Sequence, residues 1–154
     1  MKKKPDWETH LVVTNETQAQ VFSSVAMPKK GQIIPSVKTD GRITLQFTPI
    51  HLGHDLCIVI CGGDQPHLGA AAVAECHPNL TTSLEMSTPV SVLTLPGHKE
   101  DHLASWVAAR ISRSCGANVV VLCGIHVDNI SKTEIETIHR LIDKWCDEYI
   151  AAIC

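Results

Sequence analysis

Three short polar segments of the sequence carry the residue types that do chemistry in proteins. Residues 62–69, 95–100 and 124–129 each place a histidine beside glycine and beside a charged or amide side chain. Each segment lies at the end of an apolar run that predicts a buried strand, and loops at strand ends can converge on one site. Glycines expose backbone amides, and a helix N-terminus attracts anions. The first chemistry that these segments indicate is therefore recognition of an anion such as a phosphate group.

A second chemistry is metal binding. Imidazole and carboxylate groups suit zinc or iron, and a metal-dependent enzyme would use His67, His98, His126 and Asp128. Neither signal is specific by itself, because histidines in loops are often solvated or capping groups. The glycine segment also lacks the Gly-Lys-Ser/Thr of a phosphate-binding P-loop and the pattern of a dinucleotide fingerprint.

A conventional nucleophile is missing. The sequence has no Gly-x-Ser-x-Gly elbow, and its cysteines stand mostly in apolar runs that disfavour the thiolate. General acid–base work by His126 with Asp128, or by His98 with Glu100, remains open. We expect a non-catalytic protein on this ground.

The apolar patterning predicts an α/β (α+β) fold. Strands are expected at 43–47, 56–61, 68–76, 90–95 and 118–125, and helices begin near Glu100 and at a Ser131/Glu134 capping box. The expected architecture is a largely antiparallel or mixed sheet of about five strands packed with two long helices.

Two details of that architecture are specific enough to test. The short Gly/Asp/Pro connection between 56–61 and 68–76 predicts an antiparallel hairpin. The alanines at 70, 71, 72 and 74 leave room for a helix or another subunit to approach the sheet closely. Residues 1–40 are interpreted as an N-terminal extension, with short strands possible at 11–13 and 21–26, and 41–154 as a single domain.

Composition excludes several classes of protein. The chain has 154 residues, 44% of them hydrophobic and 19% charged, and a net charge of −3. This charge argues against a nucleic-acid binder, which needs a basic face. No apolar run has the length of a membrane span, and no secretory signal follows the basic N-terminus. We therefore expect a cytoplasmic protein whose seven cysteines are thiols. His102 and His139 are expected at exposed helix positions.

Taken together and in order, the three polar segments resemble the motifs of the LpdD-like proteins. These are small accessory proteins of gallate-type decarboxylases that depend on prenylated flavin. The resemblance covers residues 41–150 and rests on the joint occurrence of the three segments. It implies a homodimer with a fold similar to that of proteasome assembly chaperones. It also implies a chaperone that binds reduced prenylated FMN and helps to load it into, and activate, an aromatic acid decarboxylase of the UbiD type.

The resemblance further implies cofactor-binding roles for residues inside the three motifs. Gly63, Asp64, His67 and Gly69 would shape one wall of the site, and Gly97, His98 and Lys99 would bind the phosphate. His126, Asp128 and Asn129 would contact polar edges of the flavin. Catalytic residues and a bound metal are not expected. The alternatives are a non-catalytic structural subunit of a decarboxylase and the metal-dependent enzyme described above.

Overall fold

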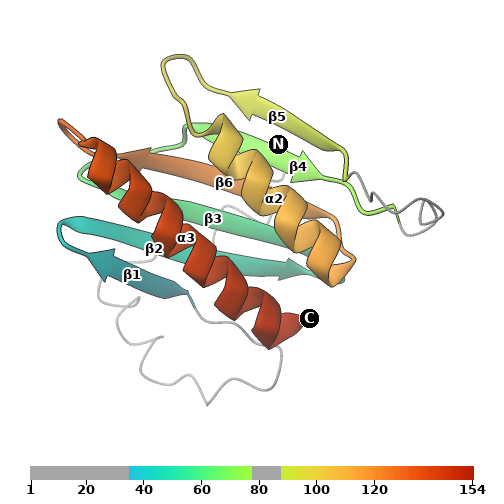
Figure 1. Cartoon of the computed structure of the whole chain (residues 1–154). Coiled ribbons are helices and arrows are strands. Elements are labelled where there is room, and N and C mark those ends of the chain that lie inside the picture. Colours follow the sequence, from blue (N-terminus) through green and yellow to red (C-terminus); the bar gives the residue numbers. More distant parts are fainter. Residues whose placement is uncertain (1–34, 78–87) are drawn as a thin grey trace, which may run out of the picture. The chain divides into compact units, whose positions relative to one another are not determined.

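The computed structural model describes residues 35–77 and 88–154. The short strands considered at 11–13 and 21–26 lie outside these residues. Within the described part, six strands form one mixed sheet, and two helices pack on it (Figure 1). The predicted α+β architecture is confirmed.

The strands do not follow one another across the sheet in chain order. They are β1 (Ser36–Asp40), β2 (Ile43–Leu52), β3 (Asp55–Gly63), β4 (Ala70–Ala74), β5 (Val90–Thr94) and β6 (Val119–His126). Their order in the sheet is β1-β2-β3-β6-β4-β5. The β3–β6 pair is parallel, and the other pairings among these strands are antiparallel.

Alternation of side chains explains why these segments form strands. In β2, the side chains of Ile43, Leu45 and Phe47 are fully buried, whereas Thr44 and Gln46 between them are exposed. A period of two is the signature of a strand with one face on the core. The same alternation runs through β3, where Leu56, Ile58 and Ile60 point into the core.

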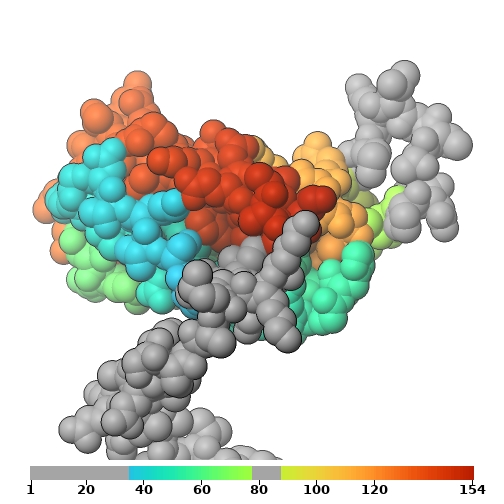
Figure 2. Space-filling model, turned by 90° about the horizontal axis from the view of Figure 1, so that it is seen from below, coloured from blue at the N-terminus to red at the C-terminus, as the bar shows by residue number. Residues whose placement is uncertain are grey.

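Both helices cover the same face of the sheet (Figure 1). Helix α2 (Asp101–Cys115) contacts β4, β5 and β6, and α3 (Lys132–Ile153) contacts β1 and β2. Figure 2 shows α3, in red, alongside the cyan β1 and β2. The buried alanines 70, 72 and 74 of β4 allow α2 to approach the sheet closely, as the sequence predicted.

An aromatic stack joins α3 to the sheet. The rings of Phe47 and Trp145 are stacked with centroids 4.6 Å apart, and Trp145 stacks in turn on Tyr149 at 4.8 Å. The indole N–H of Trp145 donates to Ser36 Oγ at 3.0 Å, so the buried ring also satisfies its polar atom. Burial raises the pKa of Tyr149 to about 12.

The helix boundaries follow from local chemistry. Gly116 ends α2 in the left-handed conformation, with φ of 63°, which glycine adopts at little cost. Ser131 and Glu134 form the predicted capping box at the start of α3. The predicted helix start and stop signals are confirmed.

The predicted β3–β4 hairpin is wrong. Strand β6 lies between the two, parallel to β3 and antiparallel to β4. The connection of residues 64–69 therefore crosses the end of β6 instead of turning back beside β3. Strand β1 was also missed, because Ser36–Asp40 had been assigned to the N-terminal extension and in the structure pairs with β2.

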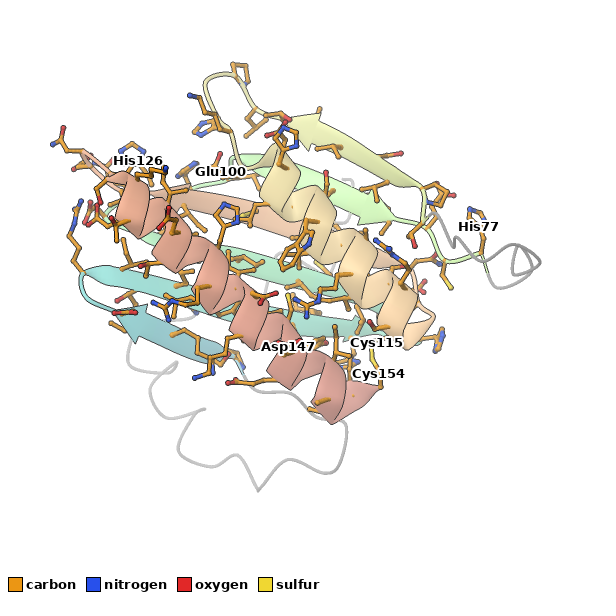
Figure 3. The ribbon with its side chains drawn as sticks, viewed as in Figure 1. His77, Glu100, Cys115, His126, Asp147 and Cys154 are labelled. Atoms are coloured by element: carbon orange, nitrogen blue, oxygen red, sulfur yellow. A yellow bond between two sulfur atoms is a disulfide. The ribbon has the colours of Figure 1, made fainter. Side chains whose placement is uncertain are left out.

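The expectation that all cysteines are thiols is also corrected. A disulfide joins Cys115, at the end of α2, to Cys154, at the end of α3, with a Cα–Cα distance of 5.1 Å. The helices converge at these ends, and the bond lies away from Glu100 and His126 (Figure 3). Cys123 and Cys146 are buried thiols, and burial raises the pKa of each to about 12. No helix in the described residues is both long and apolar enough to cross a membrane.

Candidate functional site

The three polar segments meet at one end of the sheet, next to the first turn of α2. Gly69 N–H donates to Cys123 O at 2.9 Å, and Leu95 N–H donates to Gly69 O at 2.8 Å. On the other side, Asp64 N–H donates to His126 O at 2.6 Å. Main-chain hydrogen bonds therefore connect all three segments within one chain.

Two glycines make this close approach possible. Gly63 has a φ of 77°, and a Cβ there would overlap the main chain of His126. A Cβ at Gly124 would overlap the carbonyl oxygen of His67. The segments can cross only because both positions lack a side chain.

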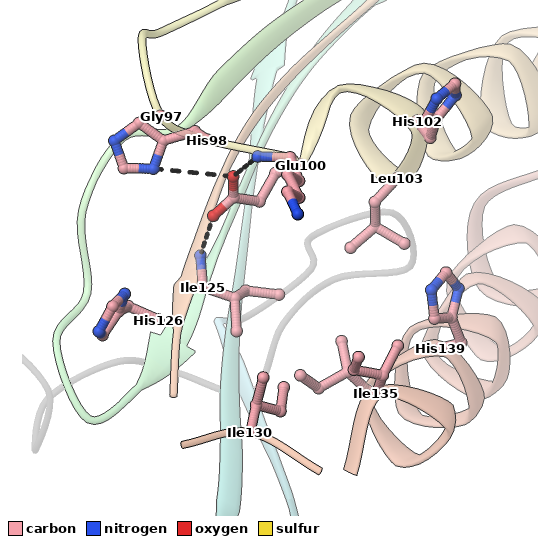
Figure 4. Close-up of a pocket in the computed structure, with 12 residues that line it drawn as sticks. Gly97, His98, Glu100, His102, Leu103, Ile125, His126, Ile130, Ile135 and His139 are labelled. Carbon is pink, nitrogen blue, oxygen red and sulfur yellow. Dashed lines mark hydrogen bonds and ion pairs between the residues drawn. The ribbon is translucent and has the colours of Figure 1, made fainter. Parts of the chain in front are cut away.

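Glu100 is the centre of the polar cluster. Its Oε1 lies 3.1 Å from His67 Nε2 and accepts from Ile125 N–H at 3.3 Å. Its Oε2 accepts from Lys99 N–H at 2.8 Å and lies 3.8 Å from His98 Nδ1 (Figure 4). The Glu100 side chain is 12% exposed. Two main-chain donors thus fix a nearly buried carboxylate between two histidines.

Gly69 provides the space for this carboxylate. A Cβ built on Gly69 would lie 2.6 Å from Glu100 Oε2. The rings of His67 and His98 pack with centroids 4.4 Å apart, and His126 lies edge-on to His67 at 6.1 Å. One histidine from each segment is therefore present in the same cluster.

Asp64 belongs to a second, neighbouring network. Its Oδ2 accepts from Asp128 N–H at 2.8 Å and lies 3.4 Å from Arg42 Nη1. Arg42 also pairs with Glu134, the capping-box residue, at 2.6 Å and donates to Asp128 O at 2.9 Å. The side-chain hydrogen bond from Arg42 is the largest cause that lowers the pKa of Glu134 to about 2, and donors of Ser131 add to it. This network holds the connection between β6 and α3 in place.

A pocket of about 440 Å³ opens beside the cluster, between the starts of α2 and α3 (Figure 4). One wall is polar and consists of Gly97, His98, Lys99, Glu100 and His126. The apolar wall consists of Leu103, Ile125, Ile130, Ile135 and Ile138, and His102 and His139 also line the pocket. The volume is in the range of small-molecule sites.

The start of α2 contributes to the polar wall. Glu100 is the N-cap residue, but its side chain makes no cap hydrogen bond to the helix. The first-turn amides therefore lack a side-chain cap and remain donors toward an anion. Lys99, directly before them, is exposed and supplies a positive charge.

The residues predicted from the sequence divide into three groups in the structure. Gly97, His98, Lys99 and His126 line the pocket. Gly63, His67 and Gly69 lie behind the polar wall, where they shape it or hold Glu100. Asp64, Asp128 and Asn129 do not line the pocket, and Asp128 instead pairs with His126 at 3.0 Å.

Sequence reasoning missed the roles of Glu100 and of the apolar wall. Glu100 was noted only as a helix-start residue and as a possible acid–base partner of His98. His102 and His139 are exposed, as expected, and they also line the pocket. The apolar wall could have been predicted from Leu103 and Ile135, because each lies in the first turns of a helix that follows one of the polar segments.

The fold can be compared with solved structures before any sequence relative is considered. The described chain is similar to a subunit in the crystal structure of a chaperone complex for yeast 20S proteasome assembly, with a TM-score of 0.51 and 14% identity. That match covers 79% of this chain and 96% of the yeast chain. At this identity the likeness shows the fold, which is that of a proteasome assembly chaperone.

The sequence comparisons specify the family. Residues 39–154 match the model of the prenylated flavin chaperone LpdD-like domain. Protein LpdD from Lactiplantibacillus plantarum is 30% identical over 97 residues, which are 60% of this chain and 64% of that protein. The match therefore spans somewhat less than two thirds of the relative. The chain belongs to the LpdD-like chaperone family.

Proposed function

We propose that this protein is a chaperone that binds reduced prenylated FMN and assists its loading into a UbiD-type aromatic acid decarboxylase. The observation that carries the proposal is the pocket with two unlike walls at the start of α2. A prenylated FMN carries a phosphate and a bulky apolar ring system. The two walls offer complementary groups for both parts.

The polar wall suits the phosphate. Lys99 supplies an ammonium group, the first turn of α2 supplies amides, and His98 and His126 supply imidazoles. The isoleucines at 130, 135 and 138 suit the ring system, because burying an apolar ring against them removes apolar surface from water. Ile130 and Ile135 are 38% and 44% exposed in the chain alone, so a ligand would cover surface that is now accessible.

A carrier role fits the groups at this site. None of the described residues that line the pocket is a cysteine. Cys123 is a buried thiol near the cluster, and burial raises its pKa to about 12. A thiol in that state is a poor nucleophile. The protein would act by binding and releasing the flavin, as a homodimer in the cytoplasm, and the decarboxylase would perform the chemistry.

Anaerobic titration with reduced prenylated FMN tests the proposal, with reduced FMN as the comparison ligand. We expect selective binding of the prenylated form. Lys99→Ala should weaken binding by about tenfold or more, since hydrogen bonds to charged groups contribute about 1.5–3 kcal/mol. The matched control is Lys144→Ala, an exposed lysine of α3 that does not line the pocket.

The competing function is that of a structural subunit of a decarboxylase. It predicts co-purification with the larger protein and no binding of either flavin. If Lys99→Ala and Ile135→Ser both bind reduced prenylated FMN as tightly as wild type, the pocket is not the flavin site. Transfer of flavin to an apo-decarboxylase is the decisive second experiment once selective binding is observed.

A further inference from the structure

Both ring nitrogens of His67 lie near oxygen atoms that accept hydrogen bonds. His67 Nδ1 lies 3.1 Å from the carbonyl oxygen of Gln65. A carbonyl oxygen can only accept, so Nδ1 carries the hydrogen and Nε2 of the neutral ring has a bare lone pair. This Nε2 is buried and has no hydrogen bond within the described residues, although Glu100 Oε1 lies 3.1 Å away.

A bare lone pair that faces a carboxylate oxygen at this distance is satisfied either by a proton on Nε2, which makes an ion pair, or by a metal ion that binds both groups. Buried polar atoms without partners cost free energy. Glu100 is held in place by the amides of Lys99 and Ile125, so it does not turn aside. His98 Nδ1 adds a third donor atom, and the three ligand atoms lie within 4.8 Å of one another.

The three groups are close enough to share one ion. Ligand bonds of about 2.1 Å to a tetrahedral zinc ion place ligand atoms about 3.4 Å apart. His67 Nε2 lies 3.1 Å from Glu100 Oε1 and His98 Nδ1 lies 3.8 Å from Glu100 Oε2, so the two histidines face different oxygens of one carboxylate at distances near that value. The hydrogen bond from His67 Nδ1 to a carbonyl is the outer-shell contact that orients metal-binding histidines.

We propose that His67, His98 and Glu100 form a binding site for a divalent transition-metal ion of the zinc type. Two imidazoles and one carboxylate leave the fourth coordination position to a non-protein ligand. His98 and Glu100 also line the pocket, so the ion would lie at the pocket wall. This set differs from that of the metal-dependent alternative considered from the sequence: Glu100 takes the place of both His126 and Asp128, which pair with each other at 3.0 Å.

The metal site shares His98 with the proposed flavin pocket, but it is tested without flavin. The full chain, treated with a chelator and then dialysed, is titrated with Zn²⁺ by calorimetry. We expect one Zn²⁺ per chain, and we expect His67→Ala and Glu100→Gln each to weaken binding by about a hundredfold, the upper end of what loss of even an outer-shell contact costs. Circular dichroism checks that each variant is folded, and Glu100→Gln keeps the size of the side chain.

His77→Ala is the matched control. His77 Nε2 also lies near a glutamate, 3.2 Å from Glu75, but the pair is exposed and far from Glu100 (Figure 3). Its loss should leave Zn²⁺ affinity unchanged. Absence of Zn²⁺ binding, or equal affinity in wild type, His67→Ala and Glu100→Gln, would overturn the proposal. Co²⁺ provides a second readout, since a thiolate charge-transfer band would place the metal on a cysteine and would equally refute it.

Discussion

Replacing Gly69 by alanine isolates the role of the Glu100 carboxylate. The new Cβ would lie 2.6 Å from Glu100 Oε2, whereas ordinary contact begins at 3.4 Å. The carboxylate must therefore move by about 0.8 Å, which is enough to weaken a well-aligned hydrogen bond. Gly69 is not among the positive-φ glycines of the described residues, so alanine fits the backbone there.

The stability of Gly69→Ala should fall only modestly. Displacing the carboxylate weakens its hydrogen bonds with Lys99 N–H and Ile125 N–H, each of which contributes about 1 kcal/mol. Alanine restricts the unfolded chain and returns about 0.4–1 kcal/mol. The free energy of unfolding should therefore fall by about 1–2 kcal/mol. Zn²⁺ affinity should nevertheless fall by about 10–100-fold, as for loss of an outer-shell contact.

Gly124→Ala provides the contrast. Its Cβ would overlap the main-chain carbonyl of His67, which cannot move as a side chain does. We expect a loss of about 3 kcal/mol in urea denaturation. The reasoning is refuted if Gly69→Ala binds Zn²⁺ as tightly as wild type, or if it is destabilised as much as Gly124→Ala.

Three further predictions concern the support of the fold. Reducing the Cys115–Cys154 disulfide, which closes a loop with a sequence separation of 39, should lower the free energy of unfolding by about 4 kcal/mol, measured in urea with and without dithiothreitol. Phe47→Ala removes a fully buried ring and should cost about 3–5 kcal/mol in the same assay. Glu134→Gln keeps the capping box but removes the charge paired with Arg42. Because the folded pKa of Glu134 is lowered to about 2, its stabilisation is present above its ordinary pKa of 4.5 and is lost as the pH falls toward 2. Wild type should therefore lose more stability than Glu134→Gln over that interval, measured by urea denaturation at each end.

Each of these has an outcome that contradicts it. Equal urea midpoints in oxidised and reduced protein would mean that the disulfide does not constrain the chain. A cost below about 1 kcal/mol for the phenylalanine variant would mean that the stack on Trp145 is dispensable. Parallel loss of stability in acid by wild type and by the glutamine variant would mean that the Arg42 pair contributes nothing.

Local features of the fold could be predicted from the sequence, and long-range pairing could not. The alternation in Ile43–Phe47 and the capping box at Ser131 depend on neighbouring residues alone, and both were found. The apolar run that forms β6 fits any buried strand, so nothing local places it between β3 and β4. The hairpin was predicted because a short connection normally joins neighbouring strands.

The candidate site shows the same division. The three polar segments were identified as units, since glycine and histidine at strand ends are visible in the sequence. Glu100 was named only as a possible acid–base partner of His98, because its central position depends on His67 and on the space left by Gly69, which are distant along the chain. The apolar wall was missed because Ile130 and Ile135 are surface positions of the chain taken alone.

The central position of β6 also bears on how the chain is made. A ribosome synthesises β3, β4, β5 and α2 before Val119–His126, so the edges of β3 and β4 that β6 will pair are still open when those two strands are made. Open edges of apolar strands favour association between nascent chains. Until β6 arrives, the β1–β3 ribbon and the β4–β5 ribbon have no strand to join them, and α2 lacks one of the strands on which it packs. A chain that ends before residue 119 should therefore be aggregation-prone, and the full chain should not.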